Sequence, residues 1–188
     1  MLGPKFDAAL VRAHALHRAH VRKQTAIPYV SHLLAVTALV LENGGDEEQA
    51  IAALLHDAVE DAGGQETLAD IRAEFGDRVA GLVAALSDSD VTPKPPWRAR
   101  KERYLAHLAD APDEVLLISA CDKVHNAGTI VEDLATIGPA VWERFSGGRD
   151  GTLWYFDALA ATFARRGPQR LAARLGELVV RMRTGPQG

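Results

Sequence analysis

Apolar residues recur at spacings of three and four along nearly the whole chain. Leu33, Val36 and Val40 form one such stripe, and Phe75 and Val79 begin another. This period places apolar side chains on one face of an α-helix. The alternation of β-branched and polar residues that is typical of a strand is missing from the sequence. The pattern therefore predicts an all-α protein, a single compact bundle of about eight to ten helices.

Glycine, proline and capping residues divide this pattern into elements. Pro28 is expected to stop the first helix, and Asp46 with Gln49 forms a capping box at the start of a later one. Residues 87–96 contain three prolines and predict the one long loop. We expect one domain over residues 1–182 and a C-terminal tail over 183–188.

Composition and charge exclude several classes of protein. The chain has 188 residues, enough for one ordinary domain, and its formal net charge is −4. An acidic balance argues against a nucleic-acid-coating protein, and the apolar runs are too short to cross a bilayer. Its single cysteine cannot form an internal disulfide. We therefore expect a cytoplasmic protein that has no nucleic-acid or membrane partner.

The most informative segment is 51–61, where five apolar residues lead into His56, Asp57, Glu60 and Asp61. In an unbroken helix these four ionisable side chains would share a sector of about 140°. Three carboxylates crowded beside a histidine repel one another unless a cation neutralises them. A divalent metal is the simplest counter-charge, and other helices must complete its coordination.

Two other segments offer the missing ligands. His32 stands near the start of a helical pattern, and Asp122 follows an apolar run, with Asn126 one turn later. Together with His56 and Asp57 they would supply two imidazoles and two carboxylates. This set suits Mn²⁺, Fe or Zn²⁺ and leaves positions open for water and substrate, whereas closed structural zinc sites usually contain thiolates.

The order of these motifs resembles the HD superfamily of metal-dependent phosphohydrolases, and within it the (p)ppGpp hydrolase domains of RelA/SpoT-type proteins and their stand-alone small alarmone hydrolase relatives. The resemblance covers residues 14–130. It implies an all-helical fold, one Mn²⁺ per chain, a role in the stringent response, and removal of the 3′-pyrophosphate from guanosine polyphosphates. The matching segments are Arg22-Lys23, Pro28-Tyr29-Val30-Ser31-His32, residues 53–61 and Asp122-Lys123-Val124-His125-Asn126.

The same resemblance implies a role for each matching residue. The metal ligands would be His32, His56, Asp57 and Asp122. Glu60 and Asp61 match the acidic pair that orients or deprotonates the attacking water. The substrate contacts would be Arg22, Lys23, Lys101, Asn126 and Tyr155. Residues 24–27 depart from the family pattern beside the base, so the preference for guanine or adenine stays open.

Several other interpretations remain open. Asp122 is also suited to a buried ion pair with Lys123 or Arg72. A second open case is the group Lys94, Trp97 and Lys101, which is suited either to a substrate lip or to the edge of a core. For His14, His17 and His20 we favour a partly exposed histidine-rich face over a second metal site. At the level of function, the alternatives are a general HD-type phosphatase acting on a 5′-monophosphate or a dNTP, or a catalytically silent nucleotide-sensing module.

Overall fold

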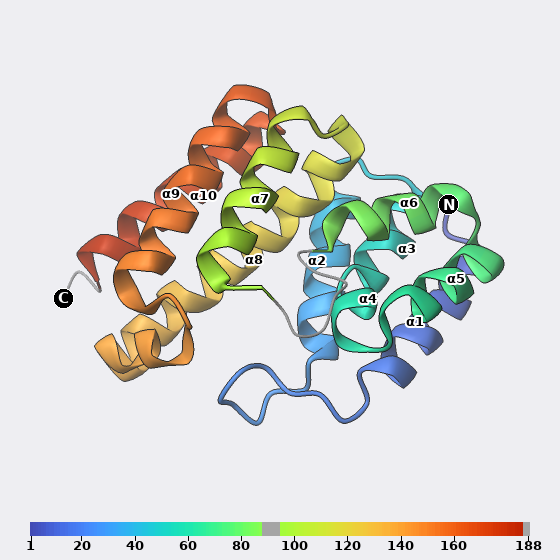
Figure 1. The fold of residues 1–188 in the computed structure, drawn as a ribbon, viewed down its shortest axis with the longest axis horizontal. Helices are drawn as coiled ribbons and strands as arrows, with labels where there is room; N and C mark the ends of the chain where they lie inside the picture. Colours follow the sequence, from blue (N-terminus) through green and yellow to red (C-terminus); the bar gives the residue numbers. More distant parts are fainter. Residues whose placement is uncertain (88–94, 186–188) are drawn as a thin grey trace. The chain divides into compact units, whose positions relative to one another are not determined.

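The computed structural model describes residues 1–87 and 95–185, and these are helical almost throughout (Figure 1). The described residues form ten α-helices and one 3₁₀ helix, and they contain no β-strand beyond an isolated bridge between Val21 and Pro28. This confirms the predicted all-α class. The chain divides into two units, Met1–Pro95 and Pro96–Gly188. The division falls within the predicted proline-rich loop, of which residues 88–94 lie outside the described residues.

The first unit contains six helices, and the His-Asp pair lies between two of them, α3 and α4. A central helix, α3, packs against α1, α2 and α6, and its apolar side chains are fully buried. A helix that is apolar on all sides belongs in a core. The helices are α1 (Pro4–Leu16), α2 (Val30–Glu42), α3 (Glu47–Leu55), α4 (Ala58–Asp61), α5 (Gly64–Phe75) and α6 (Asp77–Leu86).

The second unit is built on one long helix, α8, which packs against α9, α10 and the 3₁₀ helix η1. Its elements are α7 (Trp97–Asp110), α8 (Asp113–Ile137), η1 (Gly138–Arg144), α9 (Gly148–Arg166) and α10 (Gln169–Thr184). Helix α10 covers Arg183 and Thr184, the first two residues of the predicted tail, and residues 186–188 lie outside the described residues.

The first helix ends earlier than the sequence predicts. It stops at Leu16 instead of continuing to Pro28. The following segment folds into a narrow ribbon, in which the backbone N–H of Arg22 donates to the carbonyl of Ile27 and that of Tyr29 to the carbonyl of His20. These hydrogen bonds across the ribbon replace helical ones and satisfy the backbone after Leu16.

The helix that contains the His-Asp pair is broken at that pair. Helix α3 ends at Leu55 and α4 begins at Ala58. The Nδ1 of His56 lies 2.8 Å from the carbonyl oxygen of Ala53, which an unbroken helix would offer to the N–H of Asp57. A side-chain hydrogen bond to a backbone carbonyl competes with the helix in this way. The sector of about 140° assumed an unbroken helix, and the helix is interrupted at His56 and Asp57, although both residues keep right-handed helical backbone angles.

The start of α3 is fixed as predicted. The carboxylate of Asp46 accepts from the N–H of Gln49, and the Gln49 side chain accepts from the N–H of Asp46, which completes the capping box. Arg78 donates to Asp46 Oδ2 at 2.7 Å and to Glu48 Oε2 at 2.8 Å. Its guanidinium lowers the pKa of Asp46 below the usual value. Helix α3 is thus anchored at the end opposite to His56.

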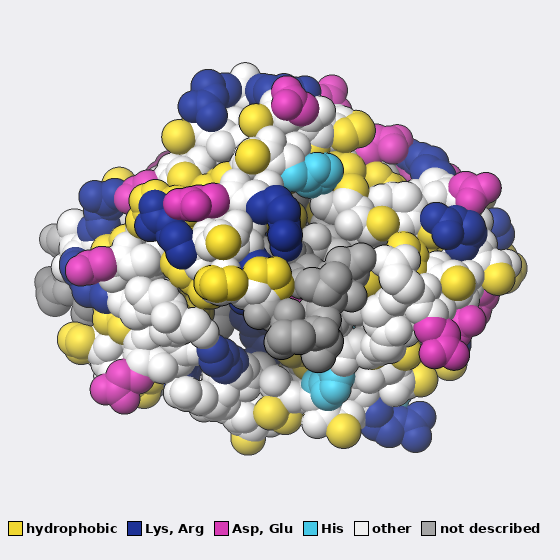
Figure 2. Space-filling model, in the orientation of Figure 1, with side chains coloured by type: hydrophobic (Ala, Val, Ile, Leu, Met, Phe, Trp, Pro, Cys, Tyr) yellow, Lys and Arg dark blue, Asp and Glu magenta, His cyan; other side chains and the backbone are white. Residues whose placement is uncertain are grey.

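Charged side chains of both signs are interspersed on the face shown in Figure 2. Among the described residues, no helix is both long enough and apolar enough to cross a membrane.

Candidate metal site

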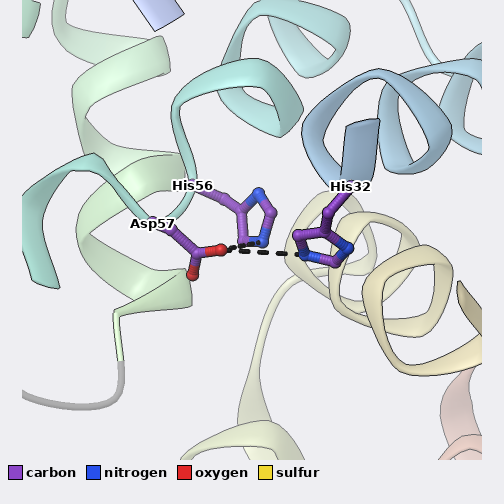
Figure 3. Close-up of side chains that lie close together, drawn as sticks. All are labelled: His32, His56 and Asp57. Carbon is purple, nitrogen blue, oxygen red and sulfur yellow. Dashed lines mark ion pairs between the residues drawn. The ribbon is translucent and has the colours of Figure 1, made fainter. Parts of the chain in front are cut away.

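Three predicted ligands come together in the first unit. Each of His32, His56 and Asp57 contributes one ligand atom, and these atoms lie within 4.8 Å of one another. Both imidazoles point toward the same oxygen of Asp57 (Figure 3): His56 Nε2 lies 2.9 Å from Oδ2, and His32 Nε2 lies 3.7 Å from it. The histidines are 1% and 3% exposed. Two nitrogens and an oxygen at this spacing can hold a divalent cation.

The tautomer of the neutral His56 ring favours metal binding. A carbonyl oxygen only accepts hydrogen bonds, so the contact with Ala53 places the hydrogen on Nδ1. In the neutral ring, Nε2 then presents a lone pair to the carboxylate of Asp57. Two lone pairs at this distance repel each other, and a cation that both atoms coordinate turns the repulsion into attraction. The residues therefore fit a metal ion.

A further side chain binds the carboxylate of this group. Tyr29, the residue before α2, donates its hydroxyl to Asp57 Oδ2 at 2.6 Å. A hydrogen bond of this length to an ionised acceptor is a strong one. Although Tyr29 lies within the quoted motif, the sequence did not indicate this contact.

The ring of His17 contacts Tyr29. The sequence predicted that His17 would lie on a partly exposed, histidine-rich face. That expectation is wrong for His17, which is 2% exposed, although His14 is exposed. Its ring stacks on Tyr29, with centroids 5.2 Å apart, and its Nδ1 lies 3.1 Å from Nδ1 of His20. Burial lowers the pKa of His17 to about 4, and Asp57 opposes this shift only in part. His17 is therefore neutral near pH 7 and adds no positive charge beside the candidate cation site.

The predicted catalytic pair follows the ligands directly. Glu60 and Asp61 lie on the short helix α4, and the N–H of Asp61 donates to the carbonyl of Asp57. Glu60 is partly buried and Asp61 is exposed. Gly63 ends this segment with φ +120°, a conformation that side-chain-bearing residues rarely adopt. Their role in activating water stays a prediction.

Arg22 and Lys23 lie on the ribbon between α1 and α2, not at the end of a helix. The guanidinium carbon of Arg22 is 5.9 Å from the centre of the Tyr29 ring, whereas Lys23 is exposed. Gln24, at the tip of the ribbon, has φ +55°, which is uncommon for a residue other than glycine. One predicted substrate residue, Arg22, thus lies beside the tyrosine that binds Asp57.

In the second unit, Asp122 forms an ion pair with Lys123, which was one of the alternatives to its role as a metal ligand. Lys123 Nζ donates to Asp122 Oδ2 at 2.5 Å, and Asn126 Nδ2 donates to Oδ1 at 2.5 Å. Burial lowers the pKa of Lys123, but Asp122, Tyr155 and Tyr104 outweigh it and hold that pKa well above its usual value. The role of Asp122 as fourth metal ligand stays a prediction.

Two other predicted substrate residues meet within the second unit. Lys101 Nζ lies 5.0 Å from the centre of the Tyr155 ring, and the ring of Trp97 packs edge-on against Tyr155. A Cβ added to Gly147 or Gly151 would lie 2.7 or 3.2 Å from the Trp97 ring, so this ring sits against the start of α9. Lys94, the third residue of the suggested lip, is outside the described residues.

The helical fold and the His/Asp group define a class of protein, an all-α protein with a candidate His/Asp metal site. A family model described as HD domain matches residues 9–153, which extend across both units. The chain belongs to the HD domain family, as the motifs indicated.

Individual relatives are similar over much of the chain. The chain is 31% identical over 146 residues to the guanosine-3′,5′-bis(diphosphate) 3′-pyrophosphohydrolase MESH1 of Xenopus tropicalis, covering 73% of this chain and 76% of that protein. It is 34% identical to a GTP pyrophosphokinase of Streptomyces coelicolor over 136 residues, 68% of this chain but only 16% of that longer protein. A solved structure, described as a metazoan ortholog of SpoT that hydrolyses ppGpp, matches with a TM-score of 0.80 and 27% identity over 96% of this chain and 97% of that one.

Proposed function

We propose that this protein is a metal-dependent hydrolase that removes the 3′-pyrophosphate of a purine nucleotide alarmone, (p)ppGpp or ppApp. The products would be the nucleoside 5′-diphosphate or 5′-triphosphate and pyrophosphate. The observation that carries the proposal is the convergence of His32, His56 and Asp57 within 4.8 Å. The names of the MESH1 relative and of the matching SpoT ortholog support the substrate class.

The proposed cofactor is one Mn²⁺ per chain, held by these three residues and by Asp122. When bound, such an ion lowers the pKa of water and polarises a phosphoryl oxygen. Glu60 or Asp61, which directly follow the ligands, would take the proton from the attacking water. The water oxygen then bonds to the phosphorus nearest the ribose, the bond from that phosphorus to the 3′-oxygen breaks, and the 3′-oxygen takes up a proton.

Cationic and polar side chains would bind the rest of the substrate. Arg22 and Lys23 carry the positive charge that the polyphosphate requires, and a guanidinium suits phosphate geometry well. For the nucleotide we propose Asn126, Lys101 and Tyr155. The contact between Lys101 and Tyr155 supports assigning these two residues to one subsite.

A product assay tests this function. The Mn²⁺-loaded protein is incubated separately with ppGpp and ppApp, and the products are resolved by anion exchange. Release of pyrophosphate and a nucleoside 5′-diphosphate is the expected result, and the ratio of the two rates measures the purine preference. An Asp57→Asn variant serves as the control for contaminating activity. If neither compound is consumed while metal is bound, the alarmone hypothesis is wrong.

The same preparation separates the two alternatives. A general HD-type phosphatase would release phosphate from nucleoside 5′-monophosphates or convert dNTPs, so these substrates are assayed in parallel. A silent nucleotide sensor would bind ppGpp without consuming it, and Glu60→Gln would not change that affinity. Cytoplasmic location and the absence of nucleic-acid or membrane partners stay predictions.

A further inference from the structure

We propose that Tyr29 is a positioning residue of the metal site, which holds Asp57 Oδ2 toward the two imidazoles, and that His17 holds Tyr29 in place. This inference rests on the proposed function only in requiring that the His/Asp group binds a metal.

The first step of the argument is the convergence on one oxygen atom. Oδ2 of Asp57 is approached by Nε2 of His56, by Nε2 of His32 and by the hydroxyl of Tyr29. The side chain of Asp57 is 22% exposed, so its carboxylate is partly in solvent and a hydrogen bond can help to fix its orientation. A hydroxyl that donates at 2.6 Å restrains it and leaves a second lone pair of the same oxygen for a cation. Partners of this kind orient metal ligands and tune their affinity.

The second step concerns how Tyr29 is held. Its ring contacts two others: it is stacked on His17 at 5.2 Å and edge-on to His32 at 5.5 Å. Its backbone N–H donates to the carbonyl of His20 across the ribbon. Two ring contacts and a backbone hydrogen bond therefore hold Tyr29. Since Tyr29 is the residue before α2 and His32 is the third residue of that helix, one short segment carries both a ligand and the group that orients another ligand.

The third step concerns the choice of histidine at position 17. The ring is buried, and its Nε2 has no hydrogen-bond partner among the residues that the structure describes, so this imidazole is costly to place there. Its contact with Tyr29 is a stacked one, at an interplanar angle of 26°, which depends on ring shape. A phenylalanine would supply the same flat ring, whereas an alanine would leave a cavity beside Tyr29.

The experiment measures the Mn²⁺ affinity of the chelator-stripped full-length protein by competition with a fluorescent chelator. Tyr29→Phe removes only the hydroxyl, and we expect a loss of Mn²⁺ affinity of about 10- to 100-fold in a variant that still folds. The matched control is Thr162→Val, which removes another buried hydroxyl, one that donates to the carbonyl of Ala158 in the second unit. We expect the control to bind Mn²⁺ like the wild type.

A second pair of variants tests His17 and keeps the proposal testable if Tyr29→Phe does not fold. His17→Ala is expected to weaken Mn²⁺ binding, and His17→Phe to restore it. Wild-type affinity in a folded Tyr29→Phe protein, or equal effects of the two His17 variants, would overturn the proposal. Asp57→Asn is measured alongside: if it too retains Mn²⁺, the proposed metal site itself is wrong, which distinguishes the two failures.

Discussion

His56 Nε2 lies 2.9 Å from Asp57 Oδ2, although the two residues are neighbours in the sequence. In an unbroken helix, adjacent side chains point about 100° apart and do not meet. Here the two residues lie at the turn that separates α3 from α4, and their side chains meet. The adjacent His and Asp can therefore act as two ligands of one cation.

Asp57→Asn tests this geometry directly. An amide keeps the size of the side chain but removes the negative charge that a divalent cation requires. We expect the purified variant to contain no bound metal by elemental analysis and to lack hydrolase activity. Asp70→Asn, at an exposed carboxylate paired with Arg12, is the control and should keep both properties. Retained metal in Asp57→Asn would exclude Asp57 as a ligand.

Glu60→Gln tests the division of roles between ligands and catalytic carboxylates. The variant should keep its metal, because Glu60 lies outside the group that converges on Asp57, but its rate should fall by about 10²-fold or more. Metal content and the rate constant at saturating substrate are the two measurements. Glu66→Gln, at an exposed residue of α5, is the matched control and should leave both unchanged. Loss of metal in Glu60→Gln would contradict the assigned role.

Much of the fold, and the grouping of three candidate metal ligands, could be predicted from the sequence alone. The helical period of the apolar residues and the capping box at Asp46 are local signals, and the structure confirms them. The grouping of His32 with the His-Asp pair is also confirmed. Here the signal was the order of the motifs, in which His32 stands near the start of a helical pattern and precedes the His-Asp pair.

The remaining features depend on contacts that no local pattern encodes. The early end of α1 and the burial of His17 depend on the ribbon folding back, so that Tyr29 reaches the carbonyl of His20. The break after Leu55 depends on the His56 side chain competing for a backbone carbonyl. In both cases a tertiary or side-chain contact outweighs the helical propensity of the sequence.

The lowered pKa of His17 predicts how stability depends on pH. The folded protein binds a proton at His17 with a pKa of about 4, and the unfolded chain with the ordinary value of 6.5. The unfolded state thus binds more protons between these values, and stability falls as the pH decreases from 6.5 to 4. This difference in pKa corresponds to about 3 kcal/mol of unfolding free energy. Melting temperatures of metal-free protein should therefore decrease over this window in the wild type and less in His17→Phe.

The matched control for this measurement is His14→Gln, because His14 is exposed in the last turn of α1, three residues before His17. Its melting temperature should follow the wild-type pH dependence. An equal slope in His17→Phe and in the wild type would show that another group causes the loss of stability.

The ion pair of Lys123 with Asp122 leads to the last prediction. Their side chains are 15% and 8% exposed, and removing one partner of a buried pair leaves the other charge uncompensated. Lys123→Met should therefore destabilise the metal-free protein by about 3 kcal/mol in a denaturant titration. In this variant the carboxylate of Asp122 no longer binds an ammonium group. If Asp122 is the fourth ligand, Mn²⁺ should therefore stabilise the variant more than it stabilises the wild type. The control is Arg144→Met, which breaks the ion pair with Asp133 in the same unit and should leave the effect of Mn²⁺ unchanged. An equal effect of Mn²⁺ on Lys123→Met and the wild type would remove Asp122 from the ligand set, and the pair would then serve only the stability of α8.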